Sequence, residues 1–115
     1  MHSVVELQAF RADAKAAGMS ADEVMDLVSF LAANPTAGEV MVGTGGARKL
    51  RWRRPGTGKS GGYRIVTYYA GADVPVFLLA AYAKGDRANL SKAERNDLAD
   101  VLRRVAARYR KGTRP

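Results

Sequence analysis

Residues 48–83 read RKLRWRRPGTGKSGGYRIVTYYAGADVPVFLLAAYA, and they carry the strand patterns from which the central sheet is predicted. Its first part, residues 48–54, alternates between apolar and basic side chains. The apolar side is formed by Leu50 and Trp52, and the opposite side by Lys49, Arg51 and Arg53. Alternation with this period is typical of a β-strand with one solvated face. We therefore expect a strand from Arg48 to Arg54 whose basic residues face water.

Two more strands are expected in the same stretch. Tyr63–Ala70 is rich in β-branched and aromatic residues, which favour strands. Val76–Ala83 is apolar on both faces, as in the central strand of a sheet, and Pro75 stands at its start, where proline is tolerated. The connections are a glycine-rich loop at 55–62 and a turn at 71–73, so we expect the three strands to run antiparallel.

The N-terminal third predicts a short extended segment, Ser3–Glu6, followed by two helices. The first helix covers about Leu7–Ala17, and the second follows directly. Their boundaries are marked by a terminating glycine, a capping box and a proline: Gly18, Ser20 with Glu23, and Asn34-Pro35. The second helix places four apolar residues on one face: Val24, Leu27, Val28 and Leu31. This third therefore predicts a helical hairpin, and Gly43–Gly46 beyond it predicts a flexible loop.

A last helix is expected from Ser91, where Ser91 and Glu94 form a second capping box. Its continuous apolar stripe predicts burial against the sheet: Leu98, Val101, Leu102, Val105, Ala106 and Tyr109. The tail from Arg110 to Pro115 is expected to fray. The element order predicts an α+β fold, with a small antiparallel sheet packed by two N-terminal helices and one C-terminal helix. At 115 residues we expect a single domain spanning the whole chain.

The charge is distributed unevenly along the chain, whose formal net charge is +8. Residues 1–45 carry two basic and six acidic side chains, for a net charge of −4. Residues 46–115 carry the other seventeen basic and five acidic side chains, for a net charge of +12. A strongly basic half on an ordinary domain is typical of a protein that binds a polyanion, and favours nucleic acid as a partner.

The composition excludes several kinds of site. The chain has no cysteine, which removes disulfides, thiolate metal sites and cysteine nucleophiles. Its one histidine is His2, so we expect neither a histidine-based metal site nor a Ser-His-Asp triad. No apolar run approaches the roughly 18 residues that a membrane span needs, and no signal peptide is recognisable. We therefore expect a cytoplasmic protein without a cofactor.

Residues 56–61, GTGKSG, match the spelling of a dinucleotide-binding motif. That motif requires a helix after the glycines, so that the helix N-terminus meets the pyrophosphate, whereas here a strand is expected. The pattern of a phosphate-binding P-loop also fails, because its first glycine would fall on Arg53. We interpret the segment as a hairpin loop whose Lys59 and backbone amides can touch RNA phosphates.

More basic residues join Lys49 and Arg51 on the neighbouring strands. Arg64 follows the hairpin loop, and Lys84 and Arg87 follow the third strand. Such a sheet would gather five or six cations over one surface, which can hold an RNA backbone. Fixed cations can also stabilise the charge of a pentacoordinate phosphorane. A sheet face that is basic for solubility alone has the same spacing, so spacing leaves both interpretations open.

Three stretches resemble the RelE/ParE toxin superfamily, and more narrowly its HigB-like branch. They are GTGGARKLRW at 43–52, GGYRIV at 61–66, and YAKG at 82–85 with Leu90-Ser91. The helical hairpin and the final helix fit as well, so the resemblance covers about Ser3 to Arg110. It implies the toxin of a type II toxin–antitoxin system, a ribosome-dependent endoribonuclease that cuts mRNA in the ribosomal A site.

The chemistry that the resemblance implies is attack of a ribose 2′-hydroxyl on the adjacent phosphate, without a metal. The implied partners are the ribosome, mRNA and a cognate antitoxin. In the HigB-like branch the antitoxin is often a helix-turn-helix DNA-binding protein, which neutralises the toxin by direct binding.

Four residues receive roles from the resemblance. Lys49 and Arg51 match the basic pair on the first long strand. Arg64 matches the arginine that contacts the scissile phosphate, and Lys84 matches a basic residue after the last strand. Arg51 and Arg64 would stabilise transition-state charge, whereas the two lysines would position the phosphate or transfer a proton. Further RNA contacts are expected from the other basic residues of this region: Arg48, Arg53, Arg54, Lys59 and Arg87.

The chain departs from the family at the groups that transfer protons. Gly85 and Ser91 stand where some relatives carry an arginine and a tyrosine, and other relatives use histidines. The general acid and base are therefore left open, with Tyr82 and Asp86 available. Tyr82 would more commonly pack within its strand.

Two other functions stay open from the sequence. The ParE branch binds and inhibits DNA gyrase, which predicts an inhibitor without ribonuclease activity. A non-catalytic nucleic-acid-binding module needs the same basic face but no proton donor. The dense cationic strand at 49–54 favours RNA over gyrase. Three tyrosines could stack on bases, although packing in the sheet is their commoner role: Tyr63, Tyr68 and Tyr69.

Overall fold

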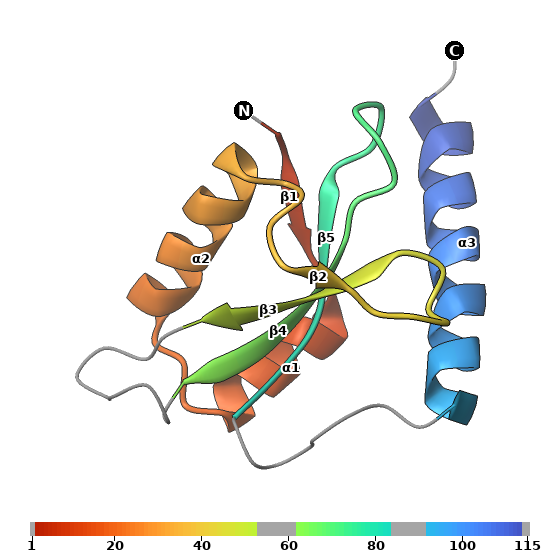
Figure 1. The fold of residues 1–115 in the computed structure, drawn as a ribbon. Helices are drawn as coiled ribbons and strands as arrows, with labels where there is room; N and C mark the ends of the chain where they lie inside the picture. Colours follow the sequence, from red (N-terminus) through yellow and green to blue (C-terminus); the bar gives the residue numbers. More distant parts are fainter. Residues whose placement is uncertain (1, 53–61, 84–91, 114–115) are drawn as a thin grey trace.

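The structure of the chain is a computed structural model that describes residues 2–52, 62–83 and 92–113. In chain order the elements are β1 (Val4–Glu6), α1 (Gln8–Ala16), α2 (Ala21–Ala33), β2 (Glu39–Val40), β3 (Ala47–Trp52), β4 (Tyr63–Tyr68), β5 (Val76–Ala83) and α3 (Lys92–Thr113). The expected α+β class is confirmed, with two N-terminal helices and one C-terminal helix around a small sheet (Figure 1).

The sheet has five strands in the order β1-β5-β4-β3-β2. β3, β4 and β5 pair antiparallel, as their alternation and connections predict. The expectation of an antiparallel sheet is incomplete, because β1 pairs parallel to β5 at one edge and the two-residue β2 pairs with β3 at the other. β5 consequently lies inside the sheet between β1 and β4, which agrees with its apolar character on both faces.

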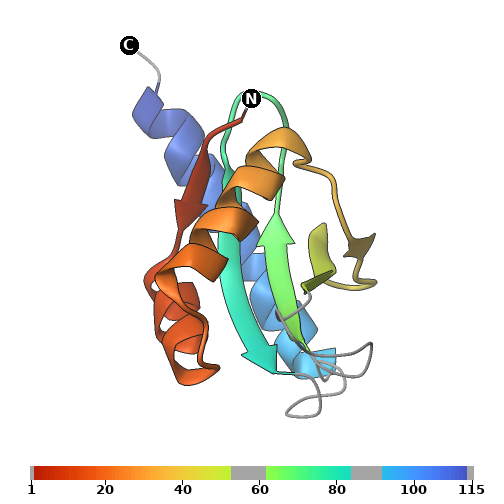
Figure 2. The ribbon, with the colours of Figure 1, turned by 90° about the vertical axis from the view of Figure 1, so that its left-hand side faces the viewer.

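The helices cover both faces of the sheet. Figures 1 and 2 show α1 and α2 on one face and α3 on the other. The core under α1 and α2 contains Phe10, Ala14, Met19, Leu27, Leu31, Tyr63, Ile65, Leu78 and Ala81. The core under α3 contains Ala47, Val66, Val74, Phe77, Leu79 and Leu102. Alternation along β3 and β4 therefore decides which core a residue joins, whereas β5 has an irregularity at which the adjacent Leu79 and Ala80 both face the core under α3.

α2 begins with the capping box that the sequence predicts. Glu23 N donates to Ser20 Oγ at 3.1 Å, and Ser20 N donates to Glu23 Oε1 at 3.0 Å. These bonds satisfy two backbone donors that the first helical turn leaves without a partner. Leu27 and Leu31 are fully buried on the predicted apolar face, and Asn34 ends the helix.

The variant Ser20→Ala should lower the free energy of unfolding by about 0.5–2 kcal/mol, because it removes the side-chain acceptor of the cap. Urea unfolding measures this change. Ser29→Ala, at an exposed position inside α2, is the matched control and should stay within about 0.5 kcal/mol of the original chain. Equal effects of the two substitutions would contradict a capping role for Ser20.

The predicted stripe on α3 packs against the sheet only in part. Leu102 and Ala106 are buried, whereas Val101 and Tyr109 at its edges stay 39% and 38% exposed. The helix continues to Thr113, beyond the expected start of fraying at Arg110. The side chains of the capping box expected at Ser91 lie outside the described residues. No helix within the described ranges is long and apolar enough to cross a membrane.

The segment at 43–46, expected to be a flexible loop, forms a hydrogen-bonded turn instead. Thr44 is buried, its Oγ1 donates to Met41 O at 2.7 Å, and the same oxygen accepts from Ala47 N at 3.0 Å. Gly45 has φ +77°, and a Cβ there would lie 3.4 Å from the side chain of Ala99 on α3. The glycines thus allow a left-handed turn close to α3, and do not simply make the segment flexible.

Candidate nucleic-acid interface

Lys49 and Arg51 lie on the face of the sheet that α3 partly covers. Ala47, two residues before Lys49 on β3, is buried in the core under α3. Leu50 and Trp52, at the alternate positions, pack against the core under α1 and α2. Trp52 also lies with its ring centroid 5.3 Å from that of Phe30 on α2. The predicted alternation, with Leu50 and Trp52 on one face and Lys49 and Arg51 on the other, is therefore confirmed, whereas Arg53 lies outside the described residues.

A row of polar side chains crosses three strands on this face. Arg51 on β3 is the direct partner of Arg64 on β4, and Arg64 is the direct partner of Tyr82 on β5. Directly opposed residues hold their Cβ atoms about 4.5–5.5 Å apart on the same face. Lys49 lies on the same face of β3, two residues before Arg51 and opposite Val66 on β4. The sheet thus brings together three of the four predicted catalytic residues, Lys49, Arg51 and Arg64, here called the cationic row.

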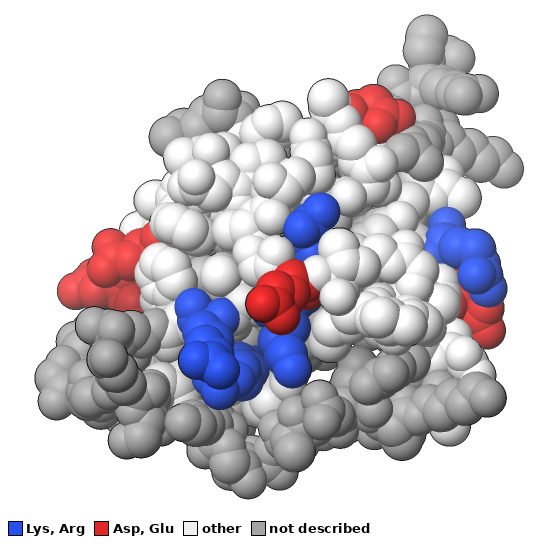
Figure 3. All heavy atoms as spheres, in the orientation of Figure 1, with Lys and Arg blue, Asp and Glu red and all other residues white. Residues whose placement is uncertain are grey.

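The cationic row is accessible but not fully solvated. Arg51 is exposed, whereas Lys49, Arg64 and Tyr82 are half-buried. Within the described residues, no acidic side chain lies within 4 Å of a charged nitrogen of the row. Figure 3 shows basic atoms gathered on the molecular surface over β3 and β4. Because like charges directly opposite each other destabilise a sheet, the pair Arg51–Arg64 costs stability that an anion would restore.

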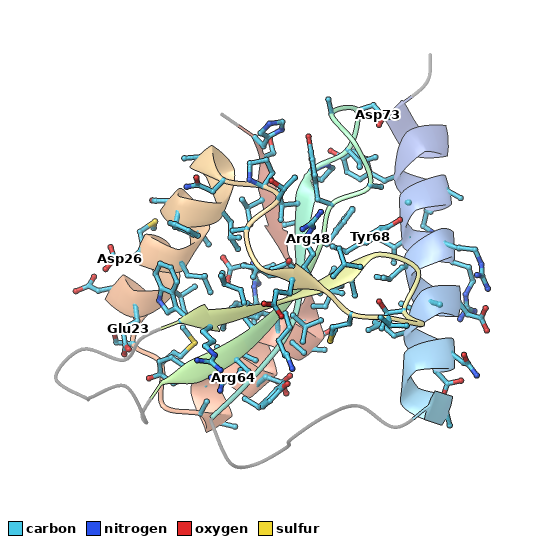
Figure 4. All side chains as sticks on the ribbon, in the orientation of Figure 1. Glu23, Asp26, Arg48, Arg64, Tyr68 and Asp73 are labelled. Atoms are coloured by element: carbon cyan, nitrogen blue, oxygen red, sulfur yellow. The ribbon has the colours of Figure 1, made fainter. Side chains whose placement is uncertain are left out.

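Arg48 lies apart from the cationic row, on the opposite face of β3. Its guanidinium donates to the carbonyl oxygens of Thr36 at 3.0 Å and Gly38 at 3.4 Å. Figure 4 shows Arg48 well separated from Arg64. Arg48 shares the alternation of Leu50 and Trp52, so the strand pattern itself distinguishes it from the other basic residues. Its position ties the segment before β2 to the sheet.

Glu39 on β2 is the direct partner of Lys49 and therefore lies on the face of the cationic row. Its side chain is exposed. No signal in the sequence marks it, because a two-residue strand is too short to show alternation. The remaining predicted contacts lie outside the described residues: Arg53, Arg54, Lys59, Lys84 and Arg87, together with Asp86.

Three tyrosines that could stack on bases are engaged in packing instead. Tyr63 is 1% exposed, and its hydroxyl donates to Glu23 Oε2 at 3.2 Å. Tyr68 stacks on Phe77 in the core under α3, with ring centroids 6.5 Å apart (Figure 4). Tyr69 meets His2 edge-on at 5.2 Å. Among the tyrosines of β4 and β5, Tyr82 is the one beside the cationic row.

Other parts of the described chain offer fewer groups for chemistry. A hollow of about 400 Å³ lies between α1 and α2, lined by the apolar residues Ala14, Met19, Ala21, Val24, Met25 and Val28 and by three charged residues, Glu6, Arg11 and Lys15. It lies across the sheet from the cationic row. Among the described residues there is no cluster of three or more histidine, aspartate or glutamate side chains that could hold a metal ion.

Comparison with known families agrees with this geometry. Residues 4–113 match the family model described as the RelE toxin of the RelE / RelB toxin-antitoxin system. The matched region includes every helix and strand of the fold and the whole cationic row. The chain therefore belongs to the RelE toxin family, and it is a toxin whose partner is a cognate antitoxin.

Proposed function

We propose that this toxin, as a member of the HigB-like branch, is a ribosome-dependent endoribonuclease that cuts mRNA in the ribosomal A site and so inhibits translation. The observation that supports this most directly is the cationic row. Two arginines from adjacent strands and a lysine share one accessible face, without an ion-pair partner among the described residues. This arrangement suits a phosphate group that gains charge during reaction.

The proposed chemistry is attack of a ribose 2′-hydroxyl on the adjacent phosphate. The guanidinium groups of Arg51 and Arg64 stabilise the extra negative charge of the phosphorane, which is largest in the transition state. Arginine suits this role because its planar group can donate two parallel hydrogen bonds to phosphate oxygens. Lys49 positions the phosphate as a point charge. Lys84 is expected to assist in positioning or in proton transfer.

The cationic row also supports a mode of neutralisation. A cognate antitoxin, in this branch a helix-turn-helix DNA-binding protein, would present an acidic segment to the same face. Complementary charge would speed the encounter and place the segment over the groups that RNA needs. Antitoxin and RNA would then compete for Lys49, Arg51 and Arg64.

The test is translation of a defined mRNA in a purified ribosome system, with the mRNA ends mapped by primer extension. The toxin should produce new 5′ ends within the translated region, and omission of ribosomes should abolish them. Addition of the antitoxin should suppress them. Intact mRNA in the presence of a folded toxin that arrests growth would contradict the proposal. A parallel gyrase supercoiling assay would then identify a gyrase inhibitor.

A further inference from the structure

We propose that Glu39 is the general base of the cleavage reaction, and this inference rests on the proposed ribonuclease function. Glu39 is the direct cross-strand partner of Lys49. It is also a diagonal neighbour of Arg51, and such neighbours lie about 7–8 Å apart with their Cβ atoms somewhat closer. Its carboxylate therefore stands at the β2 edge of the cationic row, on the face where the scissile phosphate would lie.

The backbone before Glu39 approaches β3 unusually closely. Gly38 has φ +94°, and a Cβ at this position would lie 2.7 Å from the carbonyl oxygen of Lys49. Any other residue would strain the backbone and collide with β3. Glycine at position 38 therefore allows β2 to seat Glu39 directly against Lys49.

Hydrogen bonds hold the short strand on both sides of Glu39. The Arg48 guanidinium donates to the carbonyls of Thr36 and Gly38 before it, and Met41 N donates to Ala47 O at 2.8 Å after it. Met41 packs against the core under α3, which fixes the face on which Glu39 lies. A two-residue strand held in this way presents its carboxylate in a defined position.

Glu39 is the only acidic residue of β2, β3, β4 and β5. Figure 3 shows acidic atoms beside the basic ones over the region of β2 and β3. A carboxylate repels a phosphate backbone, so on an RNA-binding face it lowers affinity. It is useful there if it removes a proton, because a positioned carboxylate can act as a general base.

The proton of the 2′-hydroxyl passes to a carboxylate oxygen of Glu39, and the 2′-oxygen forms a bond to phosphorus. The bond between phosphorus and the 5′-oxygen breaks, and the 5′-oxygen leaves with the electron pair and takes a proton from water. The products are a 2′,3′-cyclic phosphate and a 5′-hydroxyl, and Glu39 returns its proton to the solvent.

The experiment measures single-turnover mRNA cleavage on ribosomes at saturating toxin, together with ribosome affinity. Glu39→Gln should lower the cleavage rate by about 100-fold or more, because general-base catalysis contributes 10²–10⁴-fold. Its ribosome affinity should be unchanged or tighter. The matched control is Asp26→Asn, which makes the same change of charge. Asp26 is exposed on α2 and does not lie on the cationic face, so this variant should cleave mRNA as the original toxin does (Figure 4). With Glu39→Ala, added formate should restore part of the rate.

Two outcomes overturn the assignment of Glu39. The first is a Glu39→Gln rate close to that of the original toxin. The second is a defect that disappears at higher toxin concentration, which would assign Glu39 to ribosome binding. Both require that the original toxin cuts mRNA, so they differ from failure of the proposed function, in which the original toxin does not cut at all. Circular dichroism would establish that the variants are folded.

Discussion

Replacing Arg64 with glutamine should lower single-turnover cleavage by about 10²–10³-fold, as removal of one preorganised transition-state donor does in other enzymes. Arg64 on β4 lies between its two cross-strand partners, Arg51 on β3 and Tyr82 on β5. It is half-buried, so its charge is less screened than that of a fully exposed arginine. Glutamine keeps much of the aliphatic part of the side chain and a hydrogen-bond donor, but it lacks the positive charge that stabilises the phosphorane.

The same substitution should leave the fold at least as stable as before. Arg51 and Arg64 are like charges in directly opposite positions, and such pairs destabilise a sheet by about 0.2–1 kcal/mol. Removing one of them relieves this repulsion, whose direction rather than its size is what the expectation uses. We therefore expect an unfolding midpoint in urea equal to or slightly above that of the original toxin. Loss of activity without loss of stability is the usual sign of a residue kept for function.

Arg104→Gln provides the matched control, because Arg104 is an exposed arginine on α3 whose Nε donates to Asp100 O at 3.4 Å. It makes the same change in net charge away from the cationic row, so cleavage should be nearly unchanged. If both variants lost activity equally, total charge rather than the position of Arg64 would explain the effect. A destabilised Arg64→Gln protein would contradict the repulsion argument.

The parts of the fold that the sequence predicts are those with a sustained pattern. The strands predicted at 48–54 and 76–83 alternate or are apolar over many positions. The first begins within one residue of β3, whose described part ends at Trp52, and the second has the bounds of β5. The capping box of Ser20 and Glu23 is local chemistry that needs no tertiary context. The predicted extended segment Ser3–Glu6 is confirmed as β1, but no sequence pattern predicts its parallel pairing or the presence of β2, because two or three residues carry no period. Their pairing depends on the rest of the sheet.

The residues of the candidate site also divide into those that a sequence pattern predicts and those that depend on long-range pairing. Alternation in the sequence predicts that Lys49 and Arg51 share one face, whereas the register that sets Arg64 opposite Arg51 comes from the pairing of β3 with β4. Glu39 joins them only through its pairing with Lys49, which depends on the backbone of Gly38. That long-range contact has no sequence pattern. Arg48 lies on the other face of β3, because the alternation of this strand separates it from Lys49 and Arg51, and its contact with RNA stays a prediction.

Phe10→Ala should lower the free energy of unfolding by about 3–5 kcal/mol, the largest change in stability that we expect from a single substitution in this chain. Phe10 on α1 is fully buried in the core beneath α1 and α2. Its truncation removes apolar contacts and leaves a cavity between α1 and the sheet. A domain of this size is stable by about 5–15 kcal/mol, so the variant should be partly unfolded at 37 °C. Urea unfolding at 20 °C measures the change directly.

Val42→Ala is the control for Phe10→Ala, because Val42 is apolar but 81% exposed, and the change should stay within about 0.5 kcal/mol. Phe10→Ala should also lower toxicity in cells at 37 °C, yet cleave at nearly the original rate per folded molecule at 20 °C. Arg64→Gln should do the reverse, remaining folded and losing the chemical step. If Phe10→Ala were stable and inactive, α1 would be part of the site. The opposite behaviour of the two variants therefore separates the core under α1 and α2, which maintains the fold, from the cationic face, which acts on phosphate.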